Sequence, residues 1–147
     1  MQGCSVEPLG TMRYLPAVAP TLLERHLAGG EPDWARMPVV TFNAKDTLQH
    51  DLLGRVSRGG TAPPTHRVPT SADFLEALAL GLGWGMLPEA QLTPLEQAGR
   101  LVRVQPGRYV DVPLHWQRWR LDSALLARVT DAVRRAASAH LRRRSVD

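Results

Sequence analysis

The sequence predicts an α/β fold, and three observations support this prediction. Short apolar segments that are typical of strands alternate along the chain with segments that have helical spacing. Hydrophobic residues make up 44% of the 147 residues, so a single domain could bury roughly two-thirds of its unfolded surface. The region from Val68 to Pro88 has the pattern of a polar turn, a capped helix, a glycine turn and a strand. Strands that alternate with helices favour a parallel sheet.

The first third of the chain is predicted to contain extended segments, two short helices and one buried strand. Cys4 to Ala19 is interrupted by two prolines, so two short extended pieces are expected there. A short helix is expected over Thr21 to Leu27, where glycines and a proline follow. The apolar run from Pro38 to Phe42 is typical of a fully buried strand. A second helix is expected from Thr47 to about Val56, before a loop over Ser57 to Pro64.

The middle of the chain carries the most specific local pattern. Thr70 or Ser71 can cap a helix, and Asp73 follows Thr70 at the spacing of a capping box. Gly81 is suited to the end of this helix, because a residue without a Cβ is preferred there. The run from Trp84 to Pro88 is predicted to be a short buried strand that ends at the proline. The apolar residues of the helix recur at helical spacing: Phe74, Leu75, Leu78, Ala79 and Leu82.

The remaining residues predict two helices and two strands. A helix is expected from Pro94 to Ala98 and a strand from Leu101 to Val104. Val112 to Leu121 is too apolar for a strand with one solvated face, so we expect it to be largely buried. Ser123 can cap a final helix that runs from Ala124 to Leu141. The apolar face of this helix is formed by Leu125, Leu126, Val129, Val133, Ala136, Ala137 and Leu141.

The glycine-rich end of the middle segment resembles a known family. The pattern Gly81-Leu82-Gly83-Trp84-Gly85-Met86-Leu87-Pro88 is similar to the effector-binding domain of LysR-type transcriptional regulators. The pieces Lys45-Asp46-Thr47-Leu48-Gln49 and Trp116-Gln117-Arg118-Trp119-Arg120-Leu121 resemble the bacterial branch that controls export of lysine and arginine, called ArgP, LysG or IciA. Gln2 to Gly10 and Met12 to Tyr14 add to the likeness, which covers nearly all of the chain.

This resemblance implies a periplasmic-binding-protein-like fold with one near-complete Rossmann-like subdomain and the C-terminal part of a second. Residues 17–104 would form the second effector subdomain, while residues 1–16 and 105–147 would be a remnant of the first. The final strand and helix would then lack their usual partners and leave an apolar surface bare. Whether this reflects a truncated gene, a misplaced start codon or a deliberately cut fragment is left open by the sequence.

The family also implies partners. Its members form homodimers or homotetramers and bind a small-molecule effector, which for this branch would be lysine or arginine. They carry an N-terminal winged helix-turn-helix that we expect to be absent here, so DNA would be contacted only through that missing domain.

Composition restricts the location and the kind of partner. The single cysteine, Cys4, excludes an intramolecular disulfide framework, and no run approaches the roughly 20 apolar residues of a membrane span. The residues after Met1 do not resemble a signal peptide, so we expect a cytoplasmic protein without membrane contact. The net charge of +4 does not by itself indicate nucleic-acid binding, because a terminal arginine group is more often solvated. That group comprises Arg134, Arg135, Arg142, Arg143 and Arg144.

No pattern predicts an enzyme, a cofactor or a metal site. Gly81, Gly83 and Gly85 do not match the dinucleotide fingerprint, which needs a strand before it and a helix after it. No hydrolase or kinase motif is present. The five histidines lack metal-ligand spacing: His26, His50, His66, His115 and His140.

Two groups of residues can bind a ligand. Asn43 and Asp46 follow a predicted parallel strand, and open α/β sheets bind ligands at the carboxyl ends of such strands. Asp46 can take an ammonium or guanidinium group and Asn43 the amino-acid end, but Asp46 or Thr47 can equally be a simple helix cap. Thr70 and Ser71 stand at a helix N-terminus that can receive an α-carboxylate, a role compatible with capping.

Two hypotheses about function remain. The first is the effector-sensing part of a LysR-type regulator that binds lysine or arginine and controls a basic amino acid exporter gene through a population shift. The alternative is a truncated stand-alone module that binds a small ligand or a protein and does not bind DNA. Trp116 and Trp119 are interpreted as packing residues, although a tryptophan can also stack against a guanidinium group.

Overall fold

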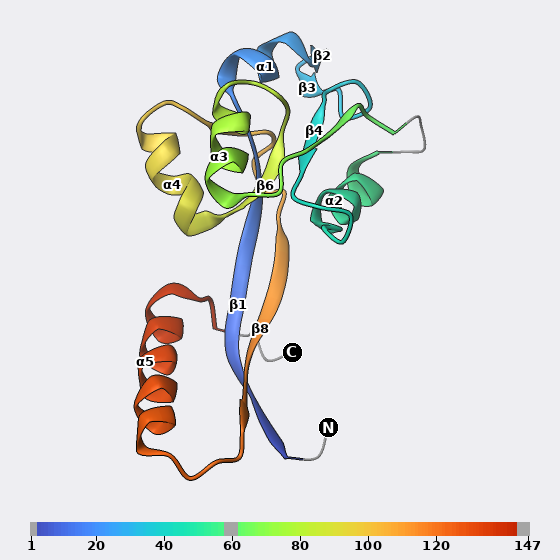
Figure 1. Ribbon diagram of the computed structural model, residues 1–147. Coiled ribbons are helices and arrows are strands. Elements are labelled where there is room, and N and C mark those ends of the chain that lie inside the picture. The colour runs from blue at the N-terminus through green and yellow to red at the C-terminus, as the bar shows by residue number, and fades with distance from the viewer. Residues whose placement is uncertain (1–2, 58–61, 144–147) are drawn as a thin grey trace. The chain divides into compact units, whose positions relative to one another are not determined.

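The computed structural model describes residues 3–57 and 62–143, which form two compact units (Figure 1). The larger unit is Tyr14–Val110, and the smaller unit combines Met1–Arg13 with Asp111–Asp147. Strand β1 (Cys4–Val18) contributes its first residues to the smaller unit and its last residues to the larger one. The assignment of the units to two effector subdomains remains a prediction.

The larger unit contains strands of both directions. β4 (Val39–Thr41) pairs in parallel with β5 (Thr65–Arg67), and a parallel bridge joins Val39 to Trp84, which directly precedes β6 (Gly85–Pro88). β1 pairs antiparallel with both β6 and β7 (Val102–Arg103). The expected parallel sheet is therefore wrong for β1, which is antiparallel to both β6 and β7.

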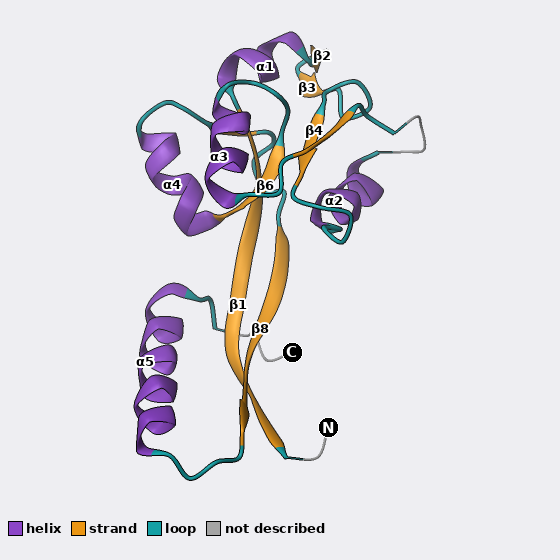
Figure 2. Cartoon of the chain, in the orientation of Figure 1, coloured by secondary structure: helices purple, strands orange, loops and turns teal. Residues whose placement is uncertain are grey.

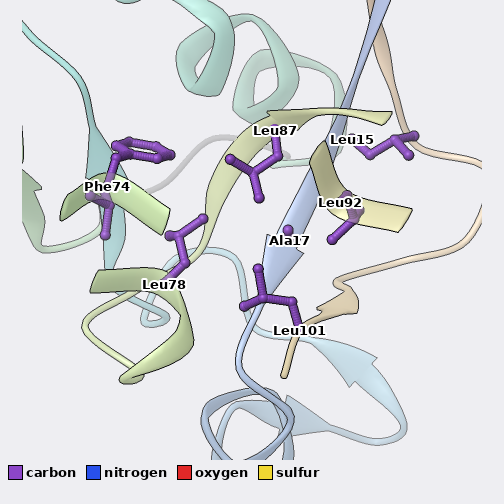
Figure 3. Close-up of a cluster of buried hydrophobic side chains, with 8 residues drawn as sticks. Leu15, Ala17, Phe74, Leu78, Leu87, Leu92 and Leu101 are labelled. Carbon is purple, nitrogen blue, oxygen red and sulfur yellow. The ribbon is translucent and has the colours of Figure 1, made fainter. Parts of the chain in front are cut away.

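Four helices accompany these strands: α1 (Pro20–Arg25), α2 (Leu48–Val56), α3 (Ser71–Ala79) and α4 (Glu89–Gln97). Figure 3 shows Phe74 and Leu78 of α3 beside Leu87 of β6 in one buried cluster. The same cluster contains Leu15, Ala17, Val40, Leu92 and Leu101. It joins α3 and α4 to one face of β1, β4 and β6, because alternate residues of a strand point to the same side.

The predicted capped helix and the strand after it are confirmed. Thr70 is the N-cap of α3, and its hydroxyl oxygen accepts a hydrogen bond from the Asp73 N–H. Gly81 has a φ of 81°, a left-handed conformation in which glycine is preferred. A Cβ at Gly83 would lie 2.7 Å from the Pro38 carbonyl oxygen. The glycines of this pattern therefore allow the chain to turn and then to pass very close to β4.

Two local predictions at prolines need correction. The segment predicted as two extended pieces over Cys4 to Ala19 forms one strand, Cys4–Val18, because β1 continues through Pro8 and Pro16. The Pro16 carbonyl oxygen accepts a hydrogen bond from the Val104 N–H, at 2.9 Å, where the pairing with β7 ends. The missing N–H of this proline therefore interrupts little of the sheet.

Helix α4 begins at Glu89, five residues before the predicted start at Pro94. Proline inside a helix removes a backbone hydrogen bond, but burial of Leu92 opposes this cost. The Thr93 hydroxyl also donates to the Glu89 carbonyl oxygen at 2.9 Å.

A small hairpin was not predicted. β2 (Leu27–Ala28) and β3 (Glu31–Pro32) are joined by Gly29 and Gly30, whose φ values are 61° and 87°. Two consecutive residues with positive φ are typical of a tight hairpin turn, so the glycine pair was the available signal. The helix predicted over Thr21 to Leu27 ends at Arg25, and Leu27 belongs to β2 instead. The other predicted elements of this unit are present, and residues 58–61 of the predicted loop lie outside the described residues.

The smaller unit is a pair of strands with one long helix. β8 (Val110–Trp119) pairs with β1, and α5 (Ala124–His140) runs beside them (Figure 2). As predicted, Ser123 caps α5, since its hydroxyl oxygen accepts a hydrogen bond from the Leu126 N–H. The Trp116 indole N–H donates to the Thr130 hydroxyl oxygen at 3.2 Å and ties the helix to β8.

Ion pairs connect the same three elements. Both guanidinium nitrogens of Arg13 that face Asp111 donate to its carboxylate at 2.7 Å. Arg134 of α5 pairs with Glu7 of β1 at 2.7 Å, so it is not simply solvated as predicted for the terminal arginine group. Arg144 of that group lies outside the described residues.

The apolar residues of β8 are less buried than predicted, whereas the exposed apolar residues of α5 agree with the bare apolar surface that the sequence led us to expect. Trp119 is 64% exposed, because successive β8 residues alternate between the two faces. Leu121, which follows the strand, is exposed to the same extent. Leu125 is 69% exposed, whereas Thr130 on the same helix is buried. The buried face of α5 is thus marked by Thr130, whose hydroxyl is hydrogen-bonded and which the predicted apolar face did not include. Leu125 lies on the opposite, outer side of the helix.

We predict that Gly83→Ala lowers the free energy of unfolding by about 1 to 3 kcal/mol, because the new methyl group would overlap a backbone carbonyl that cannot move aside cheaply. Urea denaturation measures this. Gly54→Ala is the matched control, since a Cβ at Gly54 in α2 meets nothing within 4 Å. Equal stability of the two variants would contradict the close approach at Gly83.

We also predict a pH-dependent contribution from Asp111. The hydrogen bond from Arg13 lowers the pKa of this carboxyl group below its ordinary value of 3.8. A lowered folded-state pKa stabilises the fold above the unfolded-state pKa, and that stabilisation is lost as the pH falls through the folded-state pKa. The stability difference between the wild type and Asp111→Asn should therefore be largest near neutral pH and shrink below about pH 4. A pH-independent difference in denaturation experiments would be inconsistent with this pair.

Candidate functional site

The larger unit contains a cavity of about 410 Å³ at the carboxyl ends of β4 and β6. Its size lies within the range of small-molecule sites. The cavity is lined by Tyr14, Phe42, Asn43, Lys45, Asp46, Leu48, Ser71, Phe74, Met86, Leu87, Pro88 and Gln91. Parallel strands with their helices bring these segments together, as expected for a ligand site of an open α/β sheet.

The lining combines an apolar part with a polar part. Phe74, Met86 and Leu87 are buried and belong to the packed interior of the unit. The polar lining side chains are Tyr14, Asn43, Lys45, Asp46, Ser71 and Gln91. An apolar surface with a few polar groups is the usual composition of a site that binds and orients a small polar molecule.

The turn after β4 holds its polar side chains through local hydrogen bonds. One Asp46 carboxylate oxygen accepts from the Phe42 N–H at 2.9 Å, and the other accepts from the Leu48 N–H at 3.4 Å. The Asn43 side-chain oxygen accepts from the Lys45 N–H at 2.8 Å. Asp46 therefore binds one backbone group directly after β4 and one at the start of α2, while its carboxylate keeps further acceptor sites for a cation.

Three helices begin at the cavity. Leu48 is the first residue of α2, Ser71 is the first residue of α3, and Gln91 lies in the first turn of α4. The N-terminus of a helix carries partial positive charge and free N–H groups. This lining therefore favours an anionic group in part of the cavity, in addition to a cation near Asp46.

Tyr14 adds a hydroxyl group to the cavity. Burial raises the pKa of Tyr14, and the negative charge of Asp46 raises it further. The hydroxyl thus stays protonated at neutral pH and can donate or accept a hydrogen bond.

The structure brings together three of the four predicted ligand residues. Asn43, Asp46 and Ser71 line the cavity, whereas Thr70 is not among the lining residues. The Thr70 hydroxyl instead hydrogen-bonds Asp73 within α3. Whether the four residues contact a ligand stays a prediction.

Sequence reasoning did not select Tyr14, Lys45 or Gln91. Tyr14 and Gln91 carry no local signal, because they reach the cavity only through the pairing of β1 with β6 and the early start of α4. Trp116 and Trp119 belong to the smaller unit, and the exposure of Trp119 shows that it is not a packing residue within that unit.

Within residues 3–57 and 62–143, no cluster of three or more histidine, cysteine, aspartate or glutamate side chains could hold a metal ion. None of the helices formed by these residues is both long enough and apolar enough to cross a membrane.

Comparison with known proteins gives a consistent set of matches. Residues 1–138 match the family model described as LysR substrate binding domain. The lysine export transcriptional regulatory protein LysG of Corynebacterium efficiens is 52% identical over 141 residues, which are 95% of this chain and 48% of that protein. The chain thus spans about half the length of this relative.

Solved structures agree with these sequence matches. The full-length LTTR LysG from Corynebacterium glutamicum with bound effector Arg has a TM-score of 0.88 and 45% identity, over 97% of this chain and 49% of that one. ArgP from Mycobacterium tuberculosis has a TM-score of 0.88 and 43% identity, over 97% of this chain and 49% of that one. The mixed α/β fold is therefore that of LysR effector-binding domains, as the sequence predicted.

The two neighbouring hydroxyl residues at the start of α3 should behave differently. Thr70→Ala should lower the free energy of unfolding by about 1 kcal/mol, because it removes the side-chain cap of the helix. Ser71→Ala should change stability by less than about 0.5 kcal/mol, the usual range for exposed positions without such a role. Chemical denaturation distinguishes the two, and a larger loss for Ser71→Ala would show that the capping residue is misassigned.

Proposed function

Because this chain belongs to the LysR substrate binding domain family, we propose that it is the effector-sensing part of a transcriptional regulator and that its effector is lysine or arginine. The single observation that carries the proposal is the cavity, whose lining offers a carboxylate for a cation and helix N-termini for an anion. A basic amino acid carries both of these charges. The LysG structure with bound effector Arg supports the same ligand class.

The lining suggests how such a ligand would be oriented. The side-chain cation of the ligand would lie near Asp46, with the Tyr14 hydroxyl as a neighbouring hydrogen-bond partner. The α-carboxylate would lie near Ser71 at the start of α3, where free N–H groups favour an anion. Asn43 would hydrogen-bond the amino-acid end. Thr70 would act indirectly, by capping α3 and so holding Ser71 in place.

The regulatory step would be a population shift. An effector changes the balance between two arrangements of a regulator only if it binds one arrangement more tightly than the other. In the proposed function, the relevant arrangements are those of a homodimer or homotetramer, and DNA is bound by a part of the regulator outside this sequence. The regulated gene would encode an exporter of basic amino acids; the relative from Corynebacterium efficiens is named a lysine export transcriptional regulatory protein.

Isothermal titration calorimetry tests the proposal directly. The chain should bind arginine or lysine, and Asp46→Asn should weaken that binding by about 1 to 3 kcal/mol, the range for losing a charged hydrogen-bond partner. Asparagine keeps a side-chain oxygen that can accept from the Phe42 N–H, so the turn should persist. Neutral amino acids should be affected less.

Asp51→Asn provides the matched control. Asp51 is an exposed residue in the first turn of α2, so the substitution makes the same change in charge beside the site without altering its lining. If Asp46→Asn and the wild type bind both basic amino acids with equal affinity, Asp46 does not contact the ligand and serves only as a helix cap. Failure of the wild type to bind either ligand would reject the proposed function.

A further inference from the structure

Lys45 is the only lysine in the chain. The chain has 18 lysine and arginine residues in total, and the other 17 are arginines. Arginine therefore supplies almost all of the permanent positive charge. The single exception lines the cavity.

The arginines show what the guanidinium group does in this protein. Arg13 holds Asp111, Arg134 holds Glu7, and each of these contacts uses two parallel hydrogen bonds. Arg103 pairs with Glu96 in the same way. These are fixed contacts between side chains of the fold, and the planar guanidinium group is well suited to them.

Lys45 is placed differently. Among residues 3–57 and 62–143, its ammonium group forms no ion pair, although Asp46 is the next residue. Its backbone is held in the turn by the hydrogen bond from the Lys45 N–H to Asn43, at 2.8 Å. The side chain is exposed at the lining of the cavity, and a lysine side chain is a flexible point charge with three donors. The ammonium group is therefore available to a molecule that enters the cavity.

The charge of Lys45 limits which part of a ligand it can contact. It repels the side-chain cation of lysine or arginine, for which Asp46 is the complementary group. It attracts the α-carboxylate, and the N-terminus of α3 at Ser71, which lines the same cavity, has the same preference. The neighbouring residues Lys45 and Asp46 thus bring opposite charges to the lining of the same cavity.

We propose that Lys45 is a specificity-determining residue that binds the α-carboxylate of a basic amino acid and makes the cavity reject the corresponding decarboxylated amine. The inference rests on the proposed function, because it assumes that a basic amino acid occupies the cavity. It adds a requirement that Asp46 alone does not impose. Asp46 recognises the cation, which arginine and its decarboxylated form agmatine share, whereas Lys45 recognises the group that only arginine retains.

The test is a calorimetric comparison of two ligands and three forms of the full 147-residue chain. The wild type should bind arginine at least tenfold more tightly than agmatine. Lys45→Met, which keeps most of the length of the side chain without its charge, should weaken arginine binding about 10- to 100-fold, as expected for losing a charged hydrogen-bond partner. It should leave agmatine binding unchanged or tighter, because a repelling charge is removed. Lys45→Arg should keep most of the preference for arginine.

The possible outcomes separate this inference from the proposed function. If the wild type binds arginine and Lys45→Met binds it equally well, the role of Lys45 is wrong while the proposed function stands. If Lys45→Met weakens the binding of arginine and of agmatine to the same extent, Lys45 affects the cavity in general and does not recognise the carboxylate, which contradicts the inference. If the wild type binds neither arginine nor lysine, the proposed function fails and this inference fails with it. Circular dichroism of each variant checks that the fold is retained.

A second measurement uses the same peculiarity of the sequence. Reductive methylation with ¹³C-formaldehyde labels lysine side chains and the chain amino terminus, so Lys45 is the only side chain that is labelled. Its dimethylammonium NMR signal should shift when arginine is added and should not shift with agmatine at equal concentration. An unchanged chemical shift of this signal at a saturating concentration of arginine would overturn the proposed contact.

Discussion

The contact between residues 83–84 and β4 determines the architecture of the larger unit. The Trp84 N–H donates to the Pro38 carbonyl oxygen at 2.9 Å, and the Val40 N–H donates to the Trp84 carbonyl oxygen at 2.7 Å. This pair of bonds aligns β6 with β4, so that their carboxyl ends open at the same place. The contact is possible only because Gly83 has no side chain, since a Cβ there would overlap the Pro38 oxygen. The cavity, the helix N-termini that line it and the turn with Asp46 all depend on this alignment.

The cavity is lined by side chains of opposite charge that lie close together in the sequence. Lys45 and Asp46 are consecutive, and local hydrogen bonds from the Lys45 N–H to Asn43 and from the Phe42 N–H to Asp46 hold the turn that presents them. Helix N-termini add positive potential at Ser71 and Gln91 without adding a charged side chain. A zwitterionic molecule with an additional cation matches this arrangement better than a simple anion or a simple amine does. Recognition of a basic amino acid would thus depend on the geometry of one turn and the starts of the helices around it.

Local patterns predicted most of the elements but not how they are joined. The cap at Thr70, the turn at Gly81 and the cap at Ser123 depend on neighbouring residues only, and all three could be found in the sequence. The direction of β1 could not, because strand pairing is decided by residues far apart in the chain. The continuation of β1 through Pro16 and the early start of α4 were missed for the same reason, since burial and sheet position compensate for each proline. Asn43, Asp46 and Ser71 could be named as candidates because they follow strands or begin helices, whereas Tyr14 reaches the cavity only through tertiary structure.

A crystal structure of the chain with arginine would test the central claim most directly. We expect one arginine molecule in the cavity of the larger unit, with its guanidinium group beside Asp46 and its α-carboxylate toward Lys45 and Ser71. Arginine bound in the reverse orientation, or at a place not lined by Asp46, would contradict this account of effector recognition.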